Sequence, residues 1–187
     1  MRSTSGRRPP ARWRRGGAVE DPVEEEIAYI ALGSNLGARE QHLAGALDAL
    51  RAVAGVRELA VSSVYETAPI GPGEQDFYLN AVARLTTSLA PRALLEQLLA
   101  IEATAGRRRG PERNAPRTLD LDLLLYGEHA IDEPGLEVPH PRMCDRGFVL
   151  EPLCELAPDL VVPGRTDTVE ALARRVRDAT CVRRRGP

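Results

Sequence analysis

Two aspartates separated by one residue are the side chains best suited to chemistry in this chain of 187 residues. Asp120 and Asp122 alternate with leucines in a short apolar segment. Successive strand side chains point to opposite faces, so both carboxylates should share one face. Neighbouring carboxylates repel each other, and a divalent cation would offset that repulsion. Oxygen ligands favour Mg²⁺, although two solvated aspartates on a wet sheet face remain an alternative. The leucines expected on the opposite, core-facing side are Leu119, Leu121, Leu123 and Leu125.

An arginine-rich stretch, residues 107–117, leads directly into this segment. Guanidinium groups neutralise phosphate oxygens, and phosphoryl-type transfer requires such cations beside a metal. The pairing predicts an enzyme that binds ATP and Mg²⁺ and transfers a phosphate-containing group. The chain contains no lysine and no Gly-x-x-x-x-Gly-Lys-Ser/Thr loop, which excludes the usual phosphate-binding loop. A solvated surface or a nucleic-acid patch is the alternative reading of the stretch.

Three further positions could complete a site. His140 lies between two prolines and could donate a hydrogen bond to phosphate, although a lone histidine is more often structural. Tyr78 and Asn80 would share one strand face, which suits a planar heterocycle, and ordinary sheet packing is the alternative. Phe148 could place a second ring against the first.

The elements that must position these residues follow from hydrophobic spacing. Apolar runs and alternation predict strands at 27–32, 56–65, 78–87 and 118–126. Helical spacing predicts helices from about Arg39 to Gly55 and from Pro91 to near Gly106. This β-α-β-β-α-β order predicts an α+β, ferredoxin-like sandwich: an antiparallel sheet with helices packed on one face. A short hairpin around Ile131 and Val138, a helix over 148–156 and a terminal helix from about Thr168 should follow.

Composition predicts one globular domain, with 43% apolar and 28% charged residues. We expect a disordered leader over 1–26, the catalytic domain over 27–166, and a C-terminal helix with a basic tail over 167–187. No stretch approaches 18 apolar residues, and the three cysteines match neither a zinc site nor a disulfide framework. These features predict a cytoplasmic protein.

Several motifs occur together and in order, and they identify a family resemblance. They are Ala31-Leu-Gly-Ser-Asn-Leu-Gly37, Tyr65-Glu-Thr-Ala-Pro69, Phe77-Tyr-Leu-Asn80, Gly106-Arg107, Pro116-Arg-Thr-Leu-Asp-Leu-Asp122 and Val138-Pro-His-Pro-Arg142. With them, the chain resembles 6-hydroxymethyl-7,8-dihydropterin pyrophosphokinase of folate biosynthesis, over about Ile27 to Gly164. The block from Pro116 to Asp122 is highly specific.

The resemblance implies transfer of the β,γ-diphosphate of ATP to the hydroxymethyl group of the pterin, with release of AMP. It implies two Mg²⁺ ions held by Asp120 and Asp122, and catalytic roles for Arg107 and Arg117 together with these aspartates. The ATP-binding residues implied are Glu102, Arg107, Arg109, Arg117, Leu123, His140 and Arg146. The pterin-binding residues implied are Thr67, Ile70, Tyr78, Asn80 and Phe148.

Two departures from the family pattern concern loop closure: Asn114 replaces a common Trp, and Pro141 a common Tyr. We therefore expect a more open arginine loop. Two other classes of protein share part of this pattern. An RNA-binding module shares the element order, but the chain is only 4% aromatic and its carboxylate pair would repel a phosphate backbone. A metal-dependent nuclease or nucleotidyl transferase also uses paired aspartates, but would give different products. We expect small-molecule substrates, no nucleic-acid or membrane partner, and a monomer.

Overall fold

The structure of the chain is a computed structural model that describes residues 25–69, 76–107, 116–177 and 182–183. Its first elements are β1 (Glu26–Ser34), α1 (Arg39–Ala52), β2 (Val56–Val61), β3 (Tyr65–Thr67), β4 (Tyr78–Thr87), α2 (Pro91–Thr104) and β5 (Asp120–Tyr126). The later elements are β6 (Ile131–Glu133), β7 (Leu136–Val138), the 3₁₀ turn η1 (Met143–Asp145), α3 (Gly147–Leu156), α4 (Val169–Val176) and β8 (Val182–Arg183). The predicted element order is therefore present, with one predicted strand divided in two.

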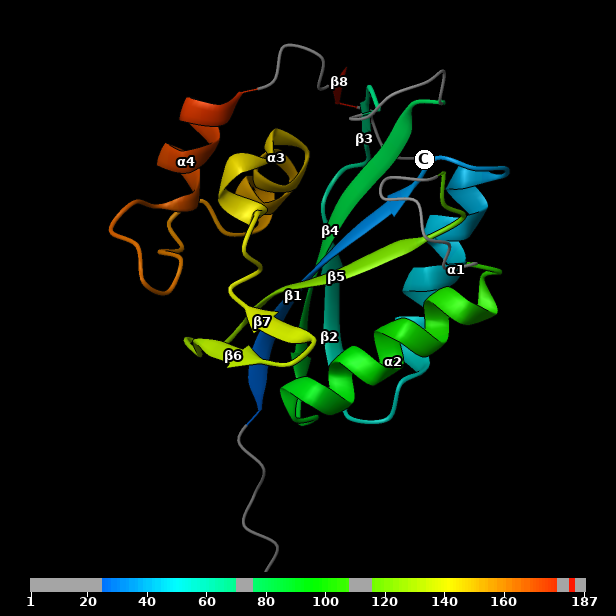
Figure 1. Ribbon diagram of the computed structural model, residues 1–187, viewed down its shortest axis with the longest axis horizontal. Coiled ribbons are helices and arrows are strands. Elements are labelled where there is room, and N and C mark those ends of the chain that lie inside the picture. The colour runs from blue at the N-terminus through cyan, green and yellow to red at the C-terminus, as the bar shows by residue number, and fades with distance from the viewer. Residues whose placement is uncertain (1–24, 70–75, 108–115, 178–181, 184–187) are drawn as a thin grey trace, which may run out of the picture.

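The main sheet has the strand order β5-β1-β4-β3-β8, and β2 also pairs with β4. The pairs β1–β4, β1–β5, β2–β4 and β3–β4 are all antiparallel. The strand predicted over 56–65 is wrong as a continuous element, because Ser62 to Val64 interrupt it between β2 and β3. Since β5 ends the sheet, its outer edge is open to contacts with other elements (Figure 1).

Helices cover both faces of this sheet (Figure 1): the two helices of the first six elements lie on one face, as predicted, and the later helices cover the other. On the first face, α1 and α2 pack apolar residues such as Leu50, Leu94 and Leu98 against the strands. On the second face, α3 and α4 pack Leu150, Leu172 and their neighbours against the other side. The later helices are thus part of the hydrophobic core. Both later helices were predicted from the sequence, but the sheet face that they cover was not.

Residues close to each helix explain which side of α1 is buried, where α1 ends and where α2 begins. In α1, Leu43, Ala46 and Leu50 recur at helical spacing and are buried. Gly55, just beyond that helix, has a φ of +89°, a conformation that glycine adopts at low cost. Pro91 begins α2, where its missing N–H costs nothing.

A change of register in β5 alters the predicted leucine pattern. Leu119, Leu121 and Leu123 lie in the core beneath α1 and α2, as predicted. Between β1 and β5 the register shifts after Tyr29, so Leu124 is an extra residue on β5. Leu125 consequently packs in the second core, under α3 and α4, and its predicted place beside the other leucines is wrong.

Among the residues described, no helix has the length and apolar content needed to cross a membrane.

Candidate active site

Strand β5 presents the two aspartates on one face of the sheet, as the alternation predicts. Asp120 pairs with Gly33 of β1, and Asp122 pairs with Ala31. These small neighbours leave space beside the carboxylates. A Cβ atom on Gly33 would lie 3.3 Å from Asn80 Oδ1 and 3.8 Å from Asp120 Cβ, so a side chain there would press on its neighbours. Glycine therefore keeps the surface between Asn80 and Asp120 open.

Asp120 accepts hydrogen bonds from two arginines that were predicted to lie near it. Arg107 Nη1 lies 2.5 Å from Asp120 Oδ1, and Arg117 Nη1 lies 2.6 Å from Asp120 Oδ2. The backbone of Arg117 is held in turn by Asn35, whose buried side-chain Oδ1 accepts from the Arg117 N–H at 2.7 Å. The Asn35 N–H donates to the Arg117 carbonyl at 3.1 Å. Asn35 thus positions the end of the arginine-rich stretch where it enters β5.

Glu102 anchors Arg107 from inside the protein. It follows Leu94 and Leu98 on the buried side of α2 and is only 2% exposed. Its Oε1 accepts a hydrogen bond from the Leu121 N–H at 2.7 Å and an ion-pair bond from Arg107. A buried carboxylate requires such partners, because its desolvation without them costs on the order of several kcal/mol. Glu102 therefore links α2, β5 and an arginine that reaches Asp120.

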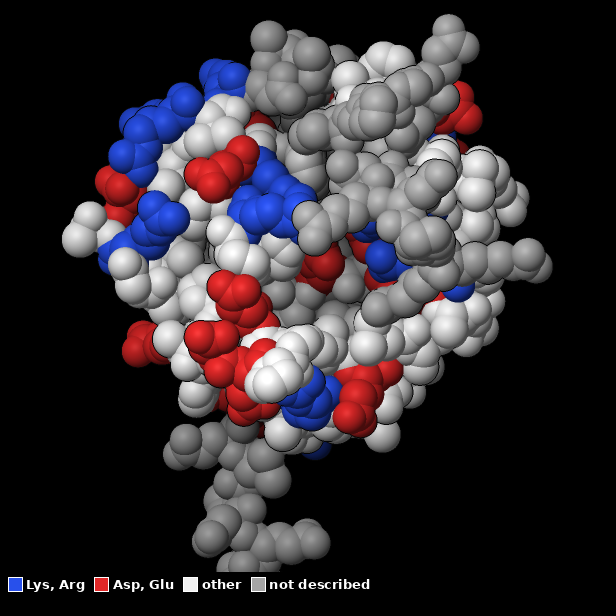
Figure 2. All heavy atoms as spheres, in the orientation of Figure 1, with Lys and Arg blue, Asp and Glu red and all other residues white. Residues whose placement is uncertain are grey.

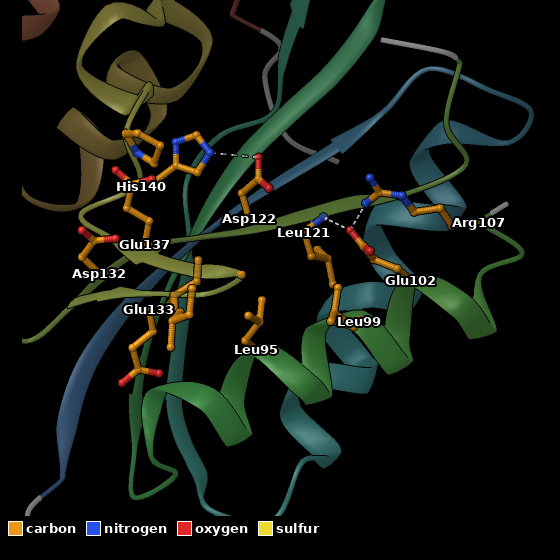
Figure 3. A pocket seen from close by; sticks show the side chains of 14 residues that line it. Leu95, Leu99, Glu102, Arg107, Leu121, Asp122, Asp132, Glu133, Glu137 and His140 are labelled. Atoms are coloured by element: carbon orange, nitrogen blue, oxygen red, sulfur yellow. Dashed lines mark hydrogen bonds and ion pairs between the residues drawn. The ribbon is translucent and has the colours of Figure 1, made fainter. Parts of the chain in front are cut away.

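Asp122 has a different environment from Asp120. The Nε2 atom of His140 lies 3.9 Å from Asp122 Oδ2 (Figure 3). Burial and the neighbouring Asp120 charge raise the pKa of the Asp122 carboxyl, and the cations nearby only partly oppose this. Asp122 is thus the carboxylate whose charge is less compensated, which is the condition that a bound cation relieves.

The proton on His140 can be assigned from its contacts. Its Nδ1 accepts a hydrogen bond from the Arg142 N–H at 3.2 Å, so the neutral ring carries its proton on Nε2. Burial lowers the pKa of His140 below its ordinary value, and the Asp122 carboxylate partly opposes this effect. A neutral ring therefore directs a donor N–H toward Asp122.

A cavity of about 380 Å³ lies along the outer edge of β5, and we call it the β5-edge cavity. Strand β5, helix α2 and the β6–β7 hairpin form its walls (Figure 3). Leu95 and Leu99 provide an apolar side, and the hairpin contributes acidic side chains. Arg107 lies at the end away from the hairpin (Figure 3). The charged lining residues are Glu102, Arg107, Asp122, Asp132, Glu133, Glu137 and His140.

A second cavity of about 430 Å³ opens on the face of the sheet, and we call it the sheet-face cavity. Its floor includes Gly33 and Asn80, and Tyr78 and Phe148 belong to its lining. Asn80 Nδ2 donates to Thr67 Oγ1 at 2.7 Å, so this polar pair is fixed beside the aromatic residues. Four arginines line the same cavity: Arg107, Arg117, Arg142 and Arg146.

The two cavities share Arg107 and Asp122. Figure 2 shows acidic side chains gathered over the β6–β7 hairpin and basic ones above them, with acidic atoms visible in the hollow between. Two ligands that occupy the two cavities would therefore meet beside the aspartates. This arrangement is suited to the transfer of a charged group from one ligand to the other.

The predicted site residues fall into both cavities. Of those assigned to the nucleotide, Glu102, Arg107, Leu123 and His140 line the β5-edge cavity, whereas Arg117 and Arg146 line only the sheet-face cavity. Of those assigned to the pterin, Thr67, Tyr78, Asn80 and Phe148 line the sheet-face cavity. The assignments to Arg109 and Ile70, and the departure at Asn114, lie outside the described residues.

Sequence reasoning missed several lining residues. The β6–β7 hairpin was predicted, but no pattern indicated that Asp132, Glu133 and Glu137 line a cavity. Arg142 carried a usable signal, because it follows His140 within the quoted motif. Asn35 also lay within a quoted motif, but its bond to Arg117 joins residues 82 positions apart.

The aspartates fit a hard divalent cation. Within the described part of the chain, no group of three or more His, Cys, Asp or Glu side chains could hold a metal. Asp120 and Asp122 would supply two carboxylates, and water and substrate phosphates would supply the remaining ligands, as is usual for Mg²⁺. The only partly compensated charge of Asp122 is consistent with such an ion.

Comparison with known proteins places the chain among relatives. The family model for 7,8-dihydro-6-hydroxymethylpterin-pyrophosphokinase (HPPK) matches residues 29–158. A 2-amino-4-hydroxy-6-hydroxymethyldihydropteridine pyrophosphokinase of Pseudomonas aeruginosa is 49% identical over 145 residues, covering 78% of this chain and 89% of that protein. The enzyme of the same name from Bacillus subtilis is 49% identical over 130 residues, covering 70% and 77%.

Solved structures share the fold at low identity. A crystal structure of an HPPK-DHPS in complex with substrates has a TM-score of 0.62 at 13% identity, covering 81% of this chain and 43% of that one. The wild-type HPPK-DHPS of Plasmodium falciparum has a TM-score of 0.66 at 15% identity, covering 84% and 47%. This chain thus spans less than half of either solved chain. Given the family match and the identities near one half, this chain belongs to the 7,8-dihydro-6-hydroxymethylpterin-pyrophosphokinase family, enzymes of folate synthesis.

Proposed function

We propose that the protein transfers the β,γ-diphosphate of ATP to 6-hydroxymethyl-7,8-dihydropterin, giving the pterin diphosphate and AMP. The observation that carries this proposal is the meeting of two cavities at Arg107 and Asp122. A transferase with two substrates needs two binding spaces whose reacting ends are adjacent. The names of the relatives from Pseudomonas aeruginosa and Bacillus subtilis, both pyrophosphokinases of a dihydropteridine, support the choice of substrates.

ATP occupies the β5-edge cavity in this proposal. Leu95 and Leu99 give an apolar wall for the base and sugar, and the phosphates extend toward Arg107 and His140. The Nε2–H of His140 donates to a phosphate oxygen, because its other nitrogen is already engaged. The acidic side chains of the hairpin repel the phosphates, so the opposite orientation of the nucleotide is disfavoured.

The pterin occupies the sheet-face cavity. Tyr78 and Phe148 stack on its ring, and Asn80 and Thr67 present amide and hydroxyl groups to its polar edge. The hydroxymethyl oxygen then lies toward the aspartates. It bonds to the β-phosphorus and releases its proton to solvent, and the bond between that phosphorus and the bridging oxygen of the α-phosphate breaks. AMP leaves with that oxygen.

Asp120 and Asp122 would hold two Mg²⁺ ions, which would neutralise phosphate charge. Arg107 and Arg117 fix Asp120 in the ligand-free protein and are close enough to contact the transferred group. Charge stabilisation of this kind supplies most of the catalysis in phosphoryl-type transfer.

Further features belong to the same proposal. The strand order β5-β1-β4-β2, with every pair antiparallel, supports a ferredoxin-like core. We also propose a catalytic domain over 27–166, cytoplasmic action as a monomer, and two small-molecule substrates without nucleic acid or membrane. Analytical ultracentrifugation of the pure protein tests the monomer.

The reaction is tested by incubating the protein with ATP, Mg²⁺ and the hydroxymethyl dihydropterin and separating the nucleotides. We expect AMP that requires both pterin and Mg²⁺, and chelation with EDTA should abolish it until Mg²⁺ is restored. Pyrophosphate as a product would indicate nucleotidyl transfer instead, and ADP would indicate transfer of one phosphoryl group. Either outcome contradicts the proposal.

Asp122→Asn tests the aspartate assignment. Turnover should fall by orders of magnitude, because the neutral amide is a poor metal ligand. The metal-free variant should be at least as heat-stable as the wild type at neutral pH, since the raised pKa of Asp122 means that its charge disfavours the native state. Asp48→Asn, which changes an exposed carboxylate on α1, is the matched control. Near-normal turnover in Asp122→Asn would remove the metal assignment.

A further inference from the structure

Two of the four arginines in the sheet-face cavity differ from the others in their partners. Arg107 and Arg117 are both paired with Asp120. Among the described residues, no carboxylate lies within ion-pair distance of Arg142 or Arg146. Two of the cations in this cavity are therefore available to an anionic ligand.

A short anchored turn presents these two arginines. Arg142 and Arg146 flank η1, and the two residues that begin this turn, Met143 and Cys144, are buried in the core under α3 and α4. The turn is closed by the Asp145 and Arg146 N–H groups, which donate to the Arg142 and Met143 carbonyls at 3.4 Å. On the other side, the Arg142 N–H is bonded to His140 Nδ1. The backbone that carries both guanidinium groups is thus held at several points.

The surroundings favour an anion between the two guanidinium groups. Arg146 is partly buried, and its guanidinium carbon lies 5.4 Å from the centre of the Phe148 ring. Burial lowers the pKa of Arg146, and the neighbouring positive charge of Arg142 lowers it further. Two like charges on one cavity wall repel each other, and a ligand with several anionic oxygens would offset that repulsion.

The position of Arg142 favours contact with a diphosphate on the pterin over contact with the phosphates of ATP. Arg142 lines the sheet-face cavity and is not among the residues of the β5-edge cavity, whereas Arg107 belongs to both. In the proposed arrangement, phosphates still attached to the nucleotide would lie in the β5-edge cavity, which Arg142 does not line. A diphosphate joined to the molecule in the sheet-face cavity would lie in the cavity that Arg142 lines.

We propose that Arg142 and Arg146 form a two-arginine clamp that binds the diphosphate after its transfer to the pterin. This inference rests on the proposed function, and it adds Arg142 to the residues that contact phosphate. The guanidinium forks of the two arginines can each donate two parallel hydrogen bonds to phosphate oxygens. The clamp holds the product, so it governs product affinity more than ATP affinity.

The experiment compares Arg142→Gln with the wild type in binding and in turnover. Loss of a charge-assisted contact at an exposed site should weaken the binding of inorganic pyrophosphate, measured by calorimetry without ATP, by about tenfold. In turnover, inhibition by the pterin diphosphate should weaken by a similar factor, while the KM for ATP stays within about twofold. If Arg142 had only a structural role, its replacement would change product inhibition and the KM for ATP together.

Two further variants sharpen the result. Arg142→Lys keeps the charge but loses the fork, so its pyrophosphate affinity should fall between those of wild type and Arg142→Gln. Arg51→Gln, at the exposed end of α1, removes the same charge far from the cavity and should bind pyrophosphate as the wild type does. Unchanged affinity in Arg142→Gln, or an equal loss in Arg51→Gln, would overturn the clamp.

The binding and turnover measurements distinguish a failure of the clamp proposal from a failure of the proposed function. The calorimetric titration uses pyrophosphate alone, so it decides the role of Arg142 without any turnover. If the wild type formed no AMP with the pterin, the proposed function would fail while the titration still decided the clamp. If AMP formed normally and the titration showed no role for Arg142, only the clamp would fail.

Discussion

Replacing Glu102 tests how the buried side of α2 supports the site. In the Glu102→Ala variant, the Leu121 N–H loses the acceptor that lies 2.7 Å from it. An unpaired buried N–H costs about 1–3 kcal/mol. Arg107 loses Glu102 but keeps Asp120 at 2.5 Å, so it is not left without a charge partner. Breaking a buried ion pair costs about 3–5 kcal/mol, and the remaining partner places the expected loss near the lower end, about 3 kcal/mol.

Two variants separate the hydrogen bond from the charge. Glu102→Gln retains an oxygen that can accept from Leu121, so it should lose less stability, about 1–2 kcal/mol. Glu96→Ala changes an exposed glutamate on the same helix and should stay within about 0.5 kcal/mol of the wild type. The comparison of the three variants assigns the stability to the buried carboxylate and not to helix propensity.

Urea unfolding of the metal-free protein at 25 °C measures these differences, and thermal unfolding provides a second measure. A loss of about 3 kcal/mol should lower the Tm by about 6–12 °C in a chain of this size. A loss below about 1 kcal/mol in Glu102→Ala would refute the reasoning that this carboxylate holds α2, β5 and Arg107 together. An equal loss in Glu96→Ala would do the same.

Two other predictions concern the contacts of Arg39 next to the sheet-face cavity and the dependence of protein stability on pH. Arg39 donates to the Phe77 carbonyl and pairs with Glu66 at 3.1 Å, beside two strands of the sheet-face cavity. Arg39→Gln should therefore raise the KM for the pterin about fivefold, by roughly 1 kcal/mol, and leave the KM for ATP unchanged; equal changes in both constants would contradict this. Tyr126 donates to the Leu89 carbonyl at 2.7 Å, and burial raises the pKa of its phenol above the ordinary value near 10. The folded state thus keeps this proton longer than the unfolded chain, so the stabilisation is complete below about pH 10 and is lost as the pH rises through the folded pKa. Urea unfolding of Tyr126→Phe should show a loss of about 1 kcal/mol at pH 8 that shrinks above pH 10, and parallel pH profiles for the two proteins would count against the assignment.

The local parts of the site could be predicted from the sequence. Asp120 and Asp122 lie on one face because strand side chains alternate, and this follows from backbone geometry alone. Tyr78 and Asn80 line the same cavity for the same reason. The strand Tyr78–Thr87 and the starts of both long helices, at Arg39 and Pro91, were also predicted correctly, because hydrophobic spacing and Pro91 act over a few residues.

Errors arose where a distant strand determined the local pattern. Leu125 was expected beside the other core leucines, but the register shift against β1 moves it to the second core. No feature of the segment 118–126 alone determines which partner residue each leucine faces. The same limit applies to the break between β2 and β3, where Ser62 bonds to Val82 of β4 through both its backbone and its hydroxyl.

The sequence by itself determined the chemistry of the central residues: paired carboxylates, adjacent arginines and motifs shared with one enzyme family. Only the tertiary structure decided which residues meet. It placed the β6–β7 hairpin opposite α2 and brought Asn35 to Arg117. It also put Arg142 on the cavity wall, where no carboxylate of the described residues pairs with it. The physical reason is range: alternation and helical spacing act between neighbours, whereas a cavity forms from elements that are far apart in the chain and are brought together by packing of the whole core.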